Sequence, residues 1–120
     1  MSKGYRDLIA WQKAMALVPL VYRAAKKLPK EETYALSDQI RRAVISVPAN
    51  IAEGQARQTP KEFVQFLYIA RGSLAELETL LLAAQSLNYL DTPTLAELEP
   101  LIAEIRKILQ GLIGRLTTEH

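Results

Sequence analysis

The side chains that most often perform catalysis are scarce in this sequence. His120 is the only histidine and lies at the end of the printed chain, so a Ser-His-Asp triad, a multi-histidine zinc site or a histidine general base would each depend on that one residue. The chain has no cysteine, which excludes a thiolate nucleophile, a thiolate metal site and a disulfide. The residue types therefore give no reason to expect an enzyme.

Motifs that bind phosphate or metal are missing as well. The sequence contains neither the G-x-G-x-x-G fingerprint nor a P-loop, and Gly111 and Gly114 are isolated within a helical pattern. Its acidic residues do not repeat the Glu-x-x-His pattern that di-iron helical bundles need. We expect no cofactor and no catalytic, cofactor-binding or metal-binding residues.

One polar strip is the most distinctive feature of the chain. At helical spacing its members are Arg42, Ser46, Asn50, Glu53 and Arg57. The strip is either a binding surface or a network between helices that fixes their register beside Pro48. The second interpretation is favoured, because buried polar groups need partners and a later helix offers Arg71 and Ser73. The predicted structural network comprises Ser46, Asn50, Glu53, Arg71 and Ser73, with Asn50 and Glu53 bonded to that later helix.

Positive charge is concentrated near the N-terminus. Residues 1–30 hold seven Lys or Arg against the single acidic residue Asp7, a local balance of +6, whereas the whole chain is +2. Such asymmetry indicates either an anionic partner or a solvated helix face. The candidate nucleic-acid-binding residues are Lys3, Arg6, Lys13, Arg23, Lys26, Lys27 and Lys30, with Arg41, Arg42 and Arg57 as secondary candidates. Tyr5, beside Lys3 and Arg6, is the best candidate for an exposed ring that stacks on a base.

Hydrophobic periodicity predicts that these residues are carried by four helices, at about 7–28, 31–56, 60–87 and 92–116. On the first helix the apolar residues form two rows, which predicts two buried flanks and one basic face. The rows are Leu8, Trp11, Met15, Val18, Tyr22, Ala25 and Ala10, Ala14, Leu17, Val21, Ala24, Leu28. The stripe of the third helix, from Phe63 to Ala84, alternates steps of four and three, as in helices that cross at about 20°.

Helix ends and breaks are also marked in the sequence. Thr59-Pro60 and Thr92-Pro93 each predict a capping residue followed by a first helical residue. Gly54 is interpreted as part of a frayed helix end. Pro19, Pro48 and Pro100 fall inside the predicted helices and predict kinks, with a start at Glu99 as an alternative for the last helix.

Length and composition favour one domain of the all-α class over residues 1–120. Hydrophobic residues make up 49% of the chain, and there are only 5 Gly and 6 Pro, too few for many short strands. Short connections favour an antiparallel up-down-up-down four-helix bundle. The longest strongly apolar stretch, near 15–22, is far too short to span a bilayer, so we expect no membrane role and a cytoplasmic protein.

Four segments of the chain form a distinctive ordered pattern over about residues 5–90. They are Tyr5-Arg6-Asp7-Leu8 with Trp11 and Lys13, Tyr34-x-Leu36-x-x-Gln39-Ile40-Arg41-Arg42-Ala43, Ser46-Val47-Pro48-x-Asn50-Ile51-Ala52-Glu53-Gly54 and Ala70-x-Gly72-Ser73-x-x-Glu76. In this order the segments resemble the four-helix bundle proteins encoded by intervening sequences in bacterial 23S ribosomal RNA genes.

The resemblance implies more than the residues themselves. Members of that family are similar to the accessory protein of diversity-generating retroelements, a basic homopentamer that binds nucleic acid and a reverse transcriptase. For this chain it implies a non-enzymatic homo-oligomer, a ring of five, that binds RNA or DNA. Residue patterns independently favour self-association, because the two rows of the first helix and further apolar residues exceed the needs of one core. These further residues are Phe66, Ile69, Leu101 and Ile108. The alternative is an assembly or scaffold protein that binds another protein.

Overall fold

Helices account for every regular element of the computed structural model, which describes residues 4–118. In chain order they are the 3₁₀ helix η1 (Gly4–Asp7), α1 (Ile9–Ala25), the 3₁₀ helix η2 (Lys30–Glu32), α2 (Leu36–Gln55), α3 (Pro60–Ser86) and α4 (Thr92–Thr118). No strand occurs in this part of the chain. The predicted all-α class and its four helices are confirmed.

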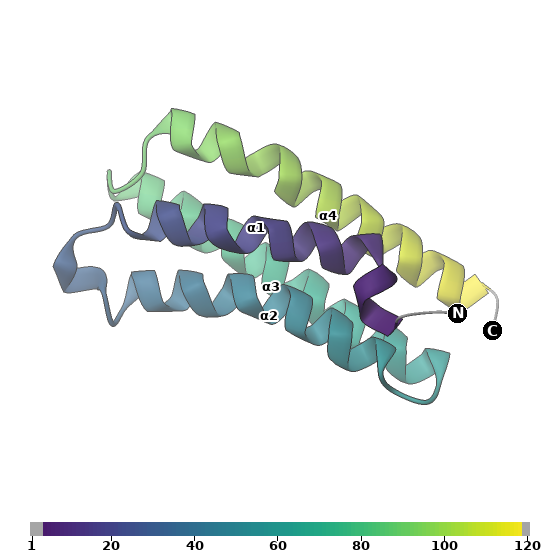
Figure 1. Cartoon of the computed structure of the whole chain (residues 1–120). Coiled ribbons are helices and arrows are strands. Elements are labelled where there is room, and N and C mark those ends of the chain that lie inside the picture. Colours follow the sequence, from purple (N-terminus) through teal and green to yellow (C-terminus); the bar gives the residue numbers. More distant parts are fainter. Residues whose placement is uncertain (1–3, 119–120) are drawn as a thin grey trace.

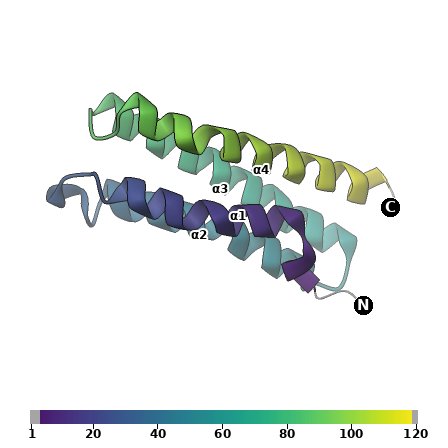
Figure 2. The ribbon, with the colours of Figure 1, turned by 45° about the horizontal axis from the view of Figure 1, so that its top comes forward.

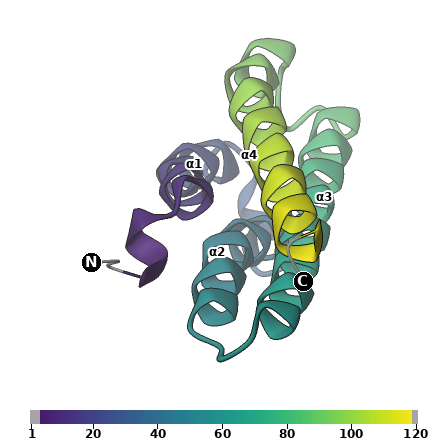
Figure 3. The same cartoon turned by 90° about the vertical axis from the view of Figure 1, so that its right-hand side faces the viewer.

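The four α-helices form an elongated bundle of 46 × 24 × 22 Å, in which the chain direction alternates from helix to helix (Figure 1). The backbones of α1 and α2, α2 and α3, α3 and α4, and α4 and α1 lie side by side, whereas no Cα atoms of the two diagonal helix pairs come within 8 Å of each other among the described residues. The end-on view in Figure 3 shows this cyclic order. Figure 2 shows the α1–α2 pair and the α3–α4 pair as two layers. Antiparallel neighbours joined by short connections are the expected result of consecutive amphipathic helices.

The core lies where the apolar stripes of the four helices meet. Leu17 and Val21 of α1, Ile40 of α2, and Leu67 and Leu74 of α3 are all fully buried. The alternation of three and four residues that predicted these stripes therefore identifies the buried faces correctly.

The second apolar row of α1 is only partly covered, which corrects the prediction of two buried flanks. Its Ala25 is buried, but Met15 is 42% exposed and Tyr22 37% exposed. Leu8, Trp11 and Val18 are half-buried at the edge of the core. Within this row Leu8 lies beside Ile108 of α4, and Tyr22 lies beside Ile45 of α2.

Helix boundaries differ most from prediction between α1 and α2. Helix α1 spans 9–25 rather than 7–28, and α2 begins at Leu36 rather than 31. The intervening residues form η2 and a turn, and the backbone at Ala35, with φ −123° and ψ −104°, is not helical. Glu32 was expected inside the first turn of α2, but its carboxylate instead accepts a hydrogen bond from the Leu36 amide at 3.2 Å and so caps the helix from outside.

The starts of α3 and α4 use two different caps. Thr59 caps α3 as predicted, because its hydroxyl accepts the Glu62 amide at 3.1 Å. At α4 the prediction of Thr92 as the cap is wrong. The Thr94 amide donates to Oδ1 of Asp91 at 2.9 Å, and Thr92 is the first helical residue. The two helices end at 86 and 118.

The three internal prolines do not interrupt the helices. Helices α1, α2 and α4 run through Pro19, Pro48 and Pro100 respectively. The alternative start of the last helix at Glu99 is therefore wrong. None of the helices in residues 4–118 combines the length and apolar character needed to cross a membrane.

Gly54 is a buried contact between α2 and α3, not part of a frayed end. A Cβ atom placed on it would lie 2.6 Å from Cβ of Phe66 and 3.0 Å from Cδ1 of Phe63. The glycine thus lets the two backbones approach closely near their connection. Helix α2 stays helical through Gln55, so a short connection leads to the start of α3 at Pro60.

Candidate functional site

The predicted basic residues do not form one continuous face. Arg23, Lys26, Lys27 and Lys30 lie around the C-terminal end of α1 and the connection to α2. Arg6 lies in η1 at the opposite end of α1. Lys3, like His120, lies outside the described residues. A helix of 17 residues is about 25 Å long, so the two ends of α1 cannot contact the same phosphate.

Several of these cations are already engaged within the subunit. Lys13 pairs with Glu104 of α4 at 3.5 Å, and the Lys27 ammonium donates to the Thr94 hydroxyl at 2.7 Å. Arg57 pairs with Glu53 at 2.7 Å and also lies over the ring of Phe66. These contacts tie α1 to α4 and stabilise the end of α2, so a ligand would have to compete for the charges.

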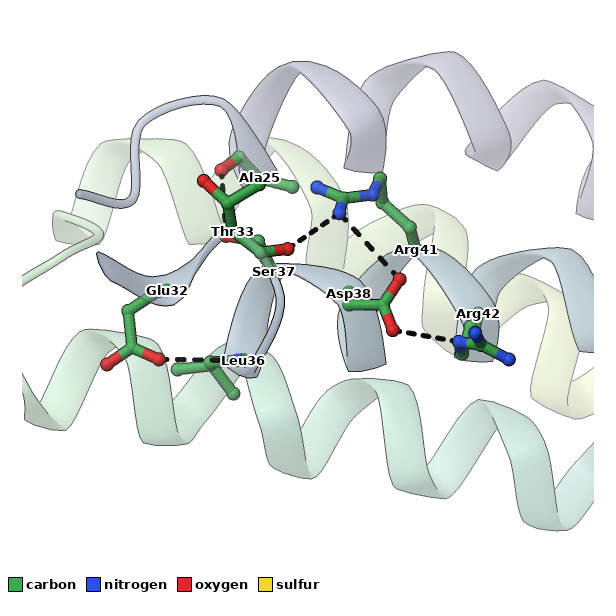
Figure 4. Close-up of polar contacts among 8 residues, drawn as sticks. All are labelled: Ala25, Glu32, Thr33, Leu36, Ser37, Asp38, Arg41 and Arg42. Atoms are coloured by element: carbon green, nitrogen blue, oxygen red, sulfur yellow. Dashed lines mark hydrogen bonds and ion pairs between the residues drawn. The ribbon is translucent and has the colours of Figure 1, made fainter. Parts of the chain in front are cut away.

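Arg41 and Arg42 share one carboxylate on α2 (Figure 4). Arg42 is bonded to Asp38 at 2.9 Å, and Arg41 lies 3.8 Å from the other oxygen of the same group. Arg41 also donates to the backbone carbonyl of Thr33 at 2.9 Å, which holds the turn that precedes α2. The guanidinium of Arg41 is therefore part of the fold, whereas the Arg42 side chain stays 80% exposed.

Arg23, Lys26 and Lys30 differ from the other candidates. All three are exposed, and no ion pair or side-chain hydrogen bond holds them within residues 4–118. They fall within eight consecutive residues that contain no acidic side chain. We call these three residues the basic cluster. It is the strongest local concentration of unneutralised positive charge that the described structure contains.

The polar strip on α2 contributes a small network between α2 and α3. The hydroxyl oxygens of Ser46 and Ser73 are 2.8 Å apart, and the Asn50 amide donates to the Ser46 carbonyl at 2.8 Å and to its hydroxyl at 3.0 Å. The structure thus brings together three of the five predicted members. Two members correct the prediction that they bond to α3. Among the described residues Asn50 bonds only to Ser46 of its own helix, and Glu53 pairs with Arg57, just past the C-terminal end of α2.

Arg71 is also a correction to the predicted network. Its guanidinium lies 4.9 Å from the ring centroid of Tyr68, on the same helix, and no bond to the α2 strip is present. Arg71 therefore takes no part in the hydrogen bond that links α2 and α3 here, which joins the hydroxyl groups of Ser46 and Ser73.

A second polar contact links distant parts of the chain at the start of α2. The Tyr89 hydroxyl donates to Glu32 at 3.1 Å, and this hydrogen bond is the main cause of a raised tyrosine pKa, to which burial adds. In the connection between α3 and α4, hydrogen bonds from Thr94 lower the pKa of the Asp91 carboxyl group. Both perturbations have structural causes, since each group either braces a turn or caps a helix.

The aromatic residues correct the expectation about base stacking. Tyr5 is half-buried and packs edge-on against Trp11, with ring centroids 5.2 Å apart. The ring left in solvent is that of Tyr34, which is 93% exposed in the turn between η2 and α2. Two features of the sequence indicated an exposed ring at Tyr34: it belongs to no apolar stripe, and it follows Lys30 by four residues. The prediction named Tyr5 instead.

Two hollows on the described part of the surface are lined by side chains that form no catalytic constellation. One of about 420 Å³ lies between the start of α1 and the end of α4 and is lined mainly by apolar residues such as Leu8 and Ile108. Another, of about 450 Å³, lies between Tyr22 and Ile45 on α1 and α2. Within the described residues no group of three or more potential metal ligands is present.

The chain resembles known proteins along most of its length. Residues 6–111 match the family model described as 23S rRNA-intervening sequence protein. A solved crystal structure of a protein of unknown function from the S23 ribosomal protein family of Bacteroides thetaiotaomicron is similar, with a TM-score of 0.80 and 25% identity. The similarity covers 88% of this chain and 98% of that one. Among curated proteins no match is found.

Proposed function

The chain belongs to the family of 23S rRNA-intervening sequence proteins, and we propose that it is a non-enzymatic, self-associating bundle that binds RNA or DNA electrostatically. The observation that carries this proposal is the basic cluster of Arg23, Lys26 and Lys30. These cations are exposed and unneutralised, and the phosphate backbone is their natural ligand.

The proposed contact is to phosphates and not to the edges of paired bases. The cluster lies at the C-terminal end of α1 and on the connection to α2, at one end of the bundle (Figure 1), and its side chains are exposed. Such a surface suits the nucleic-acid backbone, whereas reading a duplex by sequence requires an element inside a groove. We therefore expect modest affinity, little sequence preference and a strong dependence on salt.

A mobility-shift assay with structured RNA and duplex DNA, at about 50 and 200 mM salt, tests this proposal. The variant Arg23→Glu/Lys26→Glu/Lys30→Glu should abolish binding at low salt. The matched control Lys61→Glu/Lys107→Glu/Arg115→Glu changes the total charge equally at exposed positions elsewhere. It should keep most of the affinity. Equal losses in the two variants would mean that the cluster is not the site.

Self-association is the second part of the proposal, and the exposed apolar side chains support it. Apart from Ile9 and Tyr34, they fall in two sets on different helices. The first set, on α1 and α2, contains Met15, Tyr22 and Ile45, and the second set, on α3 and its C-cap, contains Tyr68, Ile69, Leu82 and Leu87. In a ring, each subunit uses two different surfaces, one toward each neighbour. Two separate apolar sets are what a ring, including a ring of five, requires.

Two variants test the ring together. Ile45→Glu damages the first surface and Ile69→Glu the second, so light scattering at tens of micromolar should show an assembly for the parent and no ring for either variant. An equimolar mixture of the variants should form a one-to-one dimer, because each retains the surface that the other lacks. A parent that is monomeric, or a mixture that does not associate, would contradict the ring.

The alternative function is an assembly protein without a nucleic-acid role. The same exposed apolar sets favour it, because they would also fit a protein partner. The two functions differ in one observable. The assembly protein would form its oligomer and yet fail to shift RNA or DNA at low salt.

A further inference from the structure

Tyr34 is a large aromatic side chain that contributes little to the packing of this fold. Its 93% exposure contrasts with the other tyrosines of the described chain. Tyr5 packs on Trp11, and Tyr89 bonds to Glu32. An aromatic ring usually buries much of its surface in a core or an interface. The exposed ring therefore offers a contact surface that the subunit itself does not use.

The turn that carries Tyr34 is fixed on both sides (Figure 4). On the Thr33 side, the backbone carbonyl accepts a hydrogen bond from Arg41 at 2.9 Å. On the other side, the Glu32 carboxylate accepts the Leu36 amide at 3.2 Å. Backbone hydrogen bonds from Thr33 to Lys30 and from Ala35 to Glu32, each 3.0 Å, close the turn itself. The ring thus projects from an ordered support, which lowers the entropy cost of binding to it.

Positive charge precedes this ring closely in the sequence. Lys30 comes four residues before Tyr34, and Lys26 and Arg23 continue the basic cluster back to the C-terminal end of α1. Glu31 is exposed and would repel a phosphate, so the phosphates are expected at these three cations. An aromatic face next to a row of cations is the combination that binds unpaired nucleotides, with bases on the ring and phosphates on the cations.

We propose that Tyr34 stacks on an unpaired base while the basic cluster holds the neighbouring phosphates, so that the ligand is single-stranded or looped nucleic acid. This inference rests on the proposed function and narrows its ligand class. A base inside a duplex presents only its edges, and the ring of Tyr34 cannot stack on it without opening the pair. The cluster alone would not distinguish the two forms.

Fluorescence anisotropy with a labelled oligouridine and with a duplex RNA of the same length tests the inference at low salt. Tyr34→Ala should weaken binding to oligouridine about tenfold, the lower-middle range for the loss of one stacked base, and change duplex binding less than twofold. Tyr34→Phe keeps the ring and should bind like the parent. Gln110→Ala is the control, because it truncates an exposed side chain on α4 outside the basic cluster and outside both apolar sets, and it should bind like the parent. The melting temperature of Tyr34→Ala should equal that of the parent, since the side chain is in solvent.

The outcomes separate this inference from the proposed function. If the parent binds both RNAs and Tyr34→Ala binds both equally well, the stacking inference is overturned and the electrostatic function stands. If Tyr34→Ala weakens both RNAs to the same degree, the ring does not select unpaired bases and the inference is again overturned. If the parent binds neither RNA at low salt, both proposals fail together.

Discussion

Replacing Gly54 with alanine should destabilise the protein, although alanine is the better helix former. The added Cβ would lie 2.6 Å from Cβ of Phe66 and 3.2 Å from the backbone oxygen of Phe63. Neither atom is the far end of a flexible side chain, so α2 and α3 must separate. Overpacking of this kind costs about 1–3 kcal/mol, and the helix propensity of alanine returns up to about 1 kcal/mol. We expect a net loss of about 1–2 kcal/mol.

Thermal and urea unfolding followed by circular dichroism measure this loss. For a chain of this length the melting temperature should fall by roughly 4–8 °C. Gly72→Ala is the matched control, because Gly72 is exposed in α3 and its Cβ would meet nothing within 4 Å. That variant should gain about 0.5–1 kcal/mol from helix propensity alone. The two substitutions should therefore have opposite signs.

The close atom of Phe66 is its Cβ, which every residue except glycine possesses. The cost of Gly54→Ala should therefore persist in a Phe66→Ala background. A Gly54→Ala variant as stable as the parent, or a cost that disappears with Phe66→Ala, would refute the claim that the two helix backbones are in close contact here.

Three further predictions concern helix ends and the polar strip. Thr59→Ala should lower the free energy of unfolding by about 1 kcal/mol, measured in urea, and Thr59→Ser should restore most of it. Because hydrogen bonds from Thr94 lower the pKa of Asp91, the cap stabilises the fold at neutral pH and is lost as the pH falls below about 4. The stability difference between the parent and Asp91→Asn should therefore shrink in acid. Asn50→Ala should cost about 1 kcal/mol, whereas Glu53→Ala should cost less than about 0.5 kcal/mol, because the ion pair between Glu53 and Arg57 is exposed and local; equal losses would contradict the assignment of the network.

Features that depend on local sequence could be predicted. The stripe of α3, with Leu67 and Leu74 buried, follows from spacing alone, and the Thr59-Pro60 start combines a cap with a residue already suited to a first helical turn. The start of α2 could not be predicted in this way. The sequence predicts Glu32 in the first turn of α2, but its carboxylate instead accepts a hydrogen bond from the hydroxyl of Tyr89, 57 residues further along the chain. That pairing exists only after the bundle forms.

The candidate site shows the same division. The number of cations near the N-terminus is visible in the sequence, but which of them stay free depends on α4. Lys27 finds Thr94 and Lys13 finds Glu104, whereas Arg23 finds no carboxylate among the described residues. Tyr34 lies in the turn between η2 and α2. The predicted α2, which began at residue 31, would have placed Tyr34 inside a helix, so the prediction gave no sign of an exposed turn here.

The cyclic order of the helices has a consequence for how the chain folds. A contact between two consecutive helices closes only a short loop, which has a small entropy cost. A contact between α1 and α4 must bring together the two ends of the chain, so we expect it to form after α2 and α3 have packed. Because α2 and α3 pack most extensively, we expect their hairpin to form early and the seam between α1 and α4 to close last. Native-state hydrogen exchange should then find the earliest sub-global opening along this seam, with α4, which packs least extensively against the rest of the bundle, exchanging ahead of α2. Arg23 of the basic cluster lines a hollow with Thr94 and Leu98 of α4, so the proposed phosphate contact begins at the edge of the seam that opens first.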